Sequence, residues 1–137
     1  MRNSDGERMK NSDWDIDLRE GIAGENSIRE LLKIETIEVK TDRRWKETGN
    51  LYIEVYCFQQ KTQSWEKSGL AISKATHYAF PLGEATIIVT REVLKETVLA
   101  QGKRIECKIE PNPSRGYLIK PEQIFAQIRN PAMITQA

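Results

Sequence analysis

The stretch Leu51–Phe58 constrains the fold more than any other part of this chain, because every position except Glu54 is apolar or aromatic. A run this short and this apolar is typical of a strand near the middle of a sheet. A carboxylate buried there without a partner would be costly. We therefore expect Glu54 to have a partner such as Lys40 or a metal ion.

The preceding segment, Ile34–Asp42, has the period-two pattern of a second strand. One face carries Ile37, Val39 and Thr41, and the other carries Glu38, Lys40 and Asp42. Turn residues at 48–50, Thr-Gly-Asn, then lead into the apolar strand. We expect these two strands to be adjacent and antiparallel, and to be flanked by the helices that start near Glu25 and Arg91.

Helix and strand signals alternate along the remaining chain, which predicts the α/β class. Thr90 is a suitable N-cap, and Pro121 suits the first position of a last helix. We expect further strands over 78–82, 85–89, 104–109 and 117–119, a polar loop over 59–67, and a short helix within 69–78. Residues 14–18 have the pattern of a short strand or an anchoring segment. A single domain over 14–130, with loose tails over 1–13 and 131–137, accounts for the whole length.

Charge and hydropathy exclude some classes of function. The net charge of +1 is not the footprint of a protein that coats DNA by charge alone. A local basic stretch is present, consisting of Lys40, Arg43, Arg44 and Lys46 beside Trp45. It is either a solvated loop or a contact for phosphates, and the tryptophan either packs in the loop or stacks on an unpaired base.

Neither a membrane segment nor an export signal is recognisable. No apolar run approaches the roughly 20 residues that span a bilayer. Residues 1–13 are polar and contain no apolar signal region, so we expect a cytoplasmic protein without a membrane partner. Cys57 and Cys107 fit two buried thiols, and His77, the one histidine, fits a structural role better than that of a general base.

Glu38 and Lys40 carry the chemistry that the sequence suggests. A carboxylate two residues from an ammonium on one strand face suits phosphate chemistry. The carboxylate can hold a hard divalent cation that activates water, and the lysine can stabilise developing charge. A surface ion pair on an exposed strand is the alternative.

The order of motifs around this pair resembles a phage and bacterial branch of the PD-(D/E)XK nuclease superfamily. The similarity runs from about residue 18 to 120 and is most specific over 37–54. It rests on Gly24-Glu25 at a helix start, the Glu38-Val39-Lys40-Thr41-Asp42 strand, Thr48-Gly49-Asn50, Glu54, Ser68-Gly69, and Ala75 before an aromatic strand. The resemblance implies a restriction-endonuclease-like fold, a mixed β-sheet flanked by helices.

The resemblance also implies an activity and its residues. It implies a Mg²⁺- or Mn²⁺-dependent deoxyribonuclease in a phage, repair or recombination setting, with DNA as partner and a possible homodimer. Glu38 would be a metal ligand, Lys40 the catalytic lysine and Glu25 the helix glutamate, and Glu54 and Asp42 are further candidate ligands. The alternatives are a catalytically degraded nucleic-acid-binding module of the same fold and an interaction protein with surface ion pairs.

The sequence departs from the family pattern at one position, because no Asp lies between Glu25 and Glu38. Asp42, Glu54 or, through a bulge, Glu35 would have to substitute for it, or the site is impaired. We expect Glu25, Glu38 and Lys40 to converge in one pocket.

Overall fold

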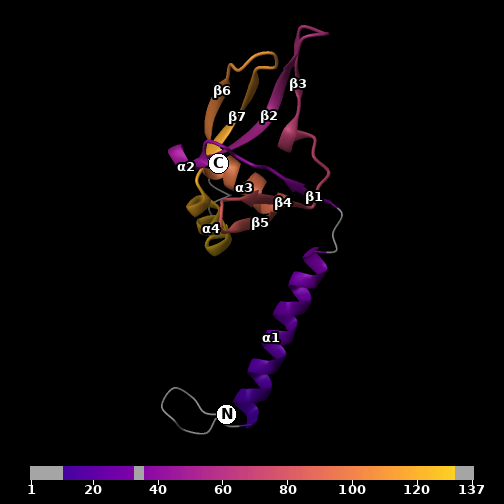
Figure 1. Cartoon of the computed structure of the whole chain (residues 1–137), viewed down its shortest axis with the longest axis vertical. Helices are drawn as coiled ribbons and strands as arrows, with labels where there is room; N and C mark the ends of the chain where they lie inside the picture. The colour runs from indigo at the N-terminus through magenta and orange to yellow at the C-terminus, as the bar shows by residue number, and fades with distance from the viewer. Residues whose placement is uncertain (1–10, 33–35, 132–137) are drawn as a thin grey trace. The chain divides into compact units, whose positions relative to one another are not determined.

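The structure is a computed structural model that describes residues 11–32 and 36–131 (Figure 1). The chain divides into two units, Met1–Glu35 and Thr36–Ala137, whose positions relative to one another are not determined. The first unit contributes one helix, α1 (Asn11–Leu32). Within residues 11–32 and 36–131, no helix combines the length and the hydropathy that a membrane span requires.

Helix α1 confirms the predicted helix around Glu25 but begins much earlier than expected. Of the two alternatives for residues 14–18, the short strand is wrong, because these residues belong to α1. Residues 11–13 also belong to this helix rather than to a tail. Trp14, Leu18 and Ile22 are spaced by four residues, as on one face of a helix. The alternating acids within 14–18 fit a strand as well, so this helical spacing was overlooked. Two internal glycines cost the helix about 1 kcal/mol each relative to alanine. The other tail residues, 1–10 and 132–137, lie outside the described residues.

The second unit contains two sheets and is of mixed α/β class, as expected. The three-stranded sheet has the order β1-β4-β5, with bounds Ile37–Val39, His77–Pro81 and Thr86–Thr90. The four-stranded sheet has the order β3-β2-β7-β6, with bounds Ser64–Lys67, Leu51–Gln59, Ser114–Ile119 and Lys103–Cys107. The pair β1–β4 is parallel, and the other pairs are antiparallel.

The predicted antiparallel pairing of β1 with β2 is wrong. β1 pairs with β4, so that Glu38 lies opposite Tyr78, while β2 lies between β3 and β7 in the other sheet. The connection between the two strands contains a short helix, α2 (Trp45–Thr48), which ends at Gly49 in the left-handed conformation. This connection carries the chain from one sheet to the other instead of forming a hairpin.

The remaining elements largely follow the sequence. Thr90 Oγ1 accepts a hydrogen bond from the Val93 amide at 3.2 Å and caps α3 (Arg91–Gln101), and α4 (Pro121–Arg129) begins with its proline. The predicted loop at 59–67 is wrong in part, because its second half is β3. The helix expected within 69–78 is only one 3₁₀ turn, η1 (Gly69–Ala71).

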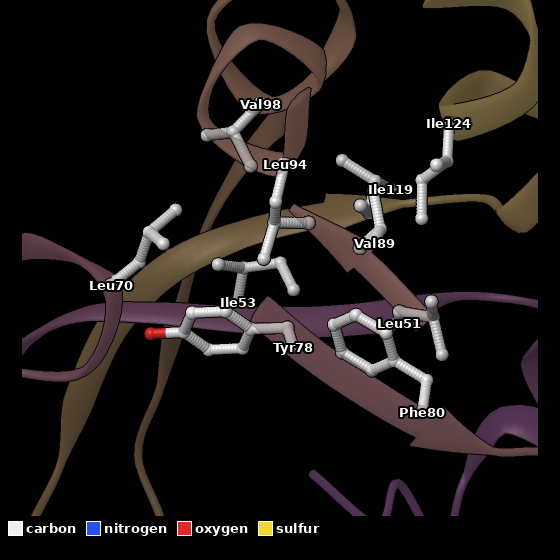
Figure 2. Packing of buried hydrophobic residues seen from close by; sticks show 10 residues of the cluster. All are labelled: Leu51, Ile53, Leu70, Tyr78, Phe80, Val89, Leu94, Val98, Ile119 and Ile124. Carbon is white, nitrogen blue, oxygen red and sulfur yellow. The ribbon is translucent and has the colours of Figure 1, made fainter. Parts of the chain in front are cut away.

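A single core joins the two sheets and the helices α3 and α4 (Figure 2). Leu51 and Ile53 of β2 meet Tyr78 and Phe80 of β4 beneath Leu94 of α3. β2 therefore has neighbouring strands along both edges and one face in the core, which confirms its predicted central place. Its opposite face, with Tyr52 and Glu54, is half-buried and lines a cleft.

Candidate functional site

Glu38 is held between a lysine and a serine. Lys40 Nζ lies 2.8 Å from Glu38 Oε1, which confirms that the two side chains share one side of the strand. The Ser73 hydroxyl donates a hydrogen bond of 2.8 Å to Glu38 Oε2 and accepts one from the Ala75 amide at 3.2 Å. Both carboxylate oxygens of Glu38 therefore have a donor.

The environment of Glu38 favours its ionised form. Burial raises its pKa, but the hydrogen bonds from Lys40 and Ser73 and the charge of Lys40 outweigh burial, so the net pKa lies below the ordinary glutamate value. The carboxylate is thus charged at neutral pH. The side chains of Glu38 and Lys40 are 33% and 46% exposed, so solvent and solutes reach the pair.

Ser73→Ala is expected to raise the pKa of Glu38 toward the ordinary glutamate value of about 4.3, because one donor to the charged form is lost. A lowered pKa in the folded state stabilises the fold above the ordinary value, and this contribution disappears as the pH falls through the lowered pKa. The variant should therefore lose it at a higher pH. NMR titration of the Glu38 carboxyl carbon measures the shift, with Ser73→Thr as the hydroxyl-retaining control. Equal titration of wild type and alanine variant would remove Ser73 from the site.

Two further side chains lie around Glu38 that sequence reasoning missed. Tyr78, opposite Glu38 in the parallel ladder, is buried, and burial is the main reason that the pKa of its hydroxyl is raised. Arg91 at the start of α3 donates from Nη1 to the Ser73 carbonyl oxygen at 2.6 Å. Only the pairing of β1 with β4 brings these residues together, and no local sequence signal gives that pairing.

The carboxylate of Asp42 accepts hydrogen bonds from backbone amides. Its Oδ2 accepts from the Tyr52 amide at 2.9 Å, and its Oδ1 accepts from the Arg44 amide at 3.0 Å. Asp42 therefore stabilises the turn that leads into α2 and ties this turn to β2. Both of its oxygens have a backbone donor, and its predicted role as a metal ligand stays a prediction.

Glu54 lies beside the cleft with a hydroxyl partner. Ser68 Oγ donates to Glu54 Oε2 at 2.8 Å, whereas Lys40, the lysine expected to pair with it, pairs with Glu38 instead. The argument that this carboxylate needs a partner holds, although the partner is uncharged.

A cleft of about 630 Å³ lies between the two sheets. Its walls are mainly apolar and include Tyr52, Ile53, Leu70, Tyr78, Phe80 and Leu118. Four cations also line it, namely Lys40, Arg43, Arg44 and Lys108. Arg43, Arg44 and Lys108 are exposed and, within residues 11–32 and 36–131, form no ion pair.

The other members of the basic stretch are placed differently. Trp45 packs against the core and its indole nitrogen is buried, which agrees with the loop-packing alternative rather than with base stacking. Lys46 is exposed on α2 but is not among the residues that line the cleft. The structure therefore brings Arg43 and Arg44, but neither Trp45 nor Lys46, to the candidate site.

The convergence of Glu25 with Glu38 and Lys40 stays a prediction. Glu25 is exposed on α1 and lies 3.7 Å from Arg29 in an ion pair, and α1 is not placed relative to the second unit. Glu35 lies outside the described residues. His77 Nδ1 lies 2.9 Å from the Thr76 hydroxyl, and the two cysteines are free thiols.

The described residues do not assemble a complete metal site. Among them, no three His, Cys, Asp or Glu side chains gather where they could hold one ion. Glu38 offers one carboxylate, but its two neighbours within hydrogen-bonding distance are a lysine and a serine. Compared with protein-family models, with curated proteins and with solved structures, the chain matches none of them.

Proposed function

We propose that the unit Thr36–Ala137 binds nucleic acid in the cleft between its two sheets. The observation that carries this proposal is the set of unpaired cations, Arg43, Arg44 and Lys108, along a mainly apolar cleft. Cations bind the phosphate backbone, and apolar walls accept sugars and base faces.

The acidic residues of the cleft reduce its positive charge without cancelling it, because four cations and three carboxylates line the cleft. Asp42 accepts two backbone amides, Glu54 accepts from Ser68, and Glu106 lies 3.1 Å from Nε of Arg115. Each carboxylate therefore already has a donor, whereas the three cations have no acidic partner in the described part of the chain. A phosphodiester backbone supplies the missing negative charge.

The double variant Arg43→Ala/Arg44→Ala is expected to bind DNA more weakly and with less dependence on salt. Each lost phosphate contact should reduce the slope of log K against log salt by about 1. Both side chains are exposed, and α2 and the turn before it are held by backbone hydrogen bonds that the alanine variants keep. The fold should therefore persist. Fluorescence anisotropy across a salt series measures the slope. The control is Lys103→Ala/Arg129→Ala, which removes the same charge from exposed positions outside the cleft. Equal slopes for the two double variants would contradict binding in the cleft.

Metal-dependent cleavage of DNA is the second candidate function, as the resemblance to the PD-(D/E)XK nucleases implies. The contact of 2.8 Å between Glu38 and Lys40 supports it, as does the exposure of both side chains. The same resemblance implies a restriction-endonuclease-like fold, which we propose together with this activity. Because the described residues do not complete a site for Mg²⁺ or Mn²⁺, a second carboxylate such as Glu25 would be needed to hold the ion.

A further inference from the structure

One face of the four-stranded sheet carries an aromatic cluster whose residues do not line the cleft. The cross-strand pairs Phe58–Trp65, Tyr56–Lys67 and Tyr56–Arg115 place these five side chains on one face of β3, β2 and β7. The strands continue beyond helices α3 and α4 here (Figure 1), and Tyr56 is 39% exposed. We call this set, Tyr56, Phe58, Trp65, Lys67 and Arg115, the aromatic face.

Three side chains of the aromatic face are in contact through their flat groups. The guanidinium carbon of Arg115 lies 3.8 Å from the centroid of the Trp65 ring. Phe58 meets the same ring edge-on, with centroids 5.5 Å apart. Arg115 is also held by Glu106, 3.1 Å from its Nε, yet half of its side chain is exposed. The stacked guanidinium therefore presents a fixed, flat and accessible surface.

The charges of this sheet are distributed unequally between its two faces. By strand register, Lys67, Arg104, Arg115 and Glu106 lie on the face that carries the aromatic cluster. Glu54, Glu66 and Lys103 lie on the other face. By this register the face with the aromatic cluster carries three cations and one carboxylate, and the opposite face carries one cation and two carboxylates. The positive charge beside the rings favours a ligand that combines flat rings with negative charge.

We propose that the aromatic face binds a short stretch of unpaired nucleotides, separately from the cleft. Bases stack on Tyr56 and on the outer plane of the Arg115 guanidinium, and phosphates lie near Lys67 and Arg104. Bases stack on tyrosine rings and on arginine planes regardless of sequence, and lysine and arginine attract the backbone. This inference rests on the proposed nucleic-acid-binding function and adds single strands to its ligands.

The aromatic cluster could instead only stabilise the far end of the sheet, and Tyr56 separates the two roles. Tyr56 has no ring contact or ion pair of its own among the described residues, unlike Trp65. Tyr56→Ala should leave the thermal unfolding transition nearly unchanged but weaken binding of a short oligo(dT) by about five- to a hundred-fold. Tyr56→Phe keeps the ring and should bind like wild type.

The test is a titration of the full chain with oligo(dT), followed by anisotropy and by the indole N–H signals of its tryptophans in NMR spectra. The proposal expects the Trp65 signal to move with saturating oligo(dT), and Tyr56→Ala to lose affinity while Tyr56→Phe does not. An unmoved Trp65 signal, or equal affinity of Tyr56→Ala and wild type, would overturn it.

Parallel measurements on Arg43→Ala/Arg44→Ala keep the two proposals apart. Loss of oligo(dT) binding in this variant but not in Tyr56→Ala overturns the aromatic face and supports the cleft. The reverse result supports the aromatic face as the site for single strands, and the salt series with duplex DNA then decides on the cleft. If wild type binds duplex DNA but not oligo(dT), the aromatic face alone is wrong; if it binds neither, both proposals fail.

Discussion

Gly69→Ala is expected to lower the free energy of unfolding by about 2–5 kcal/mol. Gly69 has φ of +50°, where a residue with a side chain costs roughly 1–2 kcal/mol. A Cβ at this position would also overlap with the backbone carbonyl oxygen of Glu54, and such overpacking costs about 1–3 kcal/mol. Urea unfolding monitored by circular dichroism measures the difference.

Gly49→Ala is the matched control for this prediction. Gly49 has a similar positive φ of 72°, but a Cβ there meets nothing within 4 Å, so only the cost of the backbone conformation applies. The difference between the two variants isolates the contact with Glu54. If both variants lose the same free energy of unfolding, the contact between a Cβ at position 69 and the Glu54 carbonyl oxygen does not destabilise the fold, and the prediction is wrong. A loss in Gly69→Ala should also disturb the cleft, which Gly69 and Glu54 both line.

If the second proposed function is correct, Lys40→Ala is expected to slow metal-dependent cleavage of DNA about 10²–10³-fold, the usual effect of losing one group that stabilises transition-state charge. Affinity for Mg²⁺ or Mn²⁺ should change little, because an ammonium is not a ligand. Glu38→Ala should lose both cleavage and metal affinity. The measurement is a cleavage assay on plasmid and single-stranded DNA across a metal titration, with calorimetry for the metal.

Arg129→Ala controls for the loss of one positive charge, since Arg129 is exposed at the end of α4. Cleavage by Lys40→Ala at the wild-type rate would remove Lys40 from the mechanism. Absence of cleavage by wild type at every metal concentration, with DNA binding retained, would leave binding as the function of this unit.

The parts of the fold that follow from local physics were predictable. The apolar run at Leu51–Phe58 required a strand with neighbours on both edges, and β2 has them. Thr90 and Pro121 marked helix starts because a capping hydroxyl and a missing amide act within one turn. The helix over residues 14–18 was missed because five residues are too few to tell the helical period of 3.6 residues from the strand period of two.

Strand partners were not predictable in the same way, because pairing depends on segments far apart in the chain. β1 has three residues and lies beside β4, while the nearest strand in sequence, β2, belongs to the other sheet. β3 was missed because a polar strand depends on its hairpin partner, here Phe58 against Trp65.

The same division applies to the candidate site. Glu38 and Lys40 share a side because residues two apart on a strand do so. Ser73, 35 residues away from Glu38, could be found only from the fold. Asp42 looked like a third member of the acidic face, but backbone amides occupy its oxygens just beyond the end of the strand.

The parallel pairing of β1 with β4 bears on how the site forms and opens. Thr36 and Thr76, whose hydroxyls lie 2.8 Å apart where this ladder begins, are separated by 40 residues, so the ladder closes a long loop while β4–β5 closes a short one. Long loops cost more entropy to close, and a three-residue edge strand has few ladder bonds to repay it. We therefore expect β1 to join late in folding and to be among the first elements to detach in native-state fluctuations. When β1 detaches, the contact between Glu38 and Lys40 should be lost even though the core stays folded.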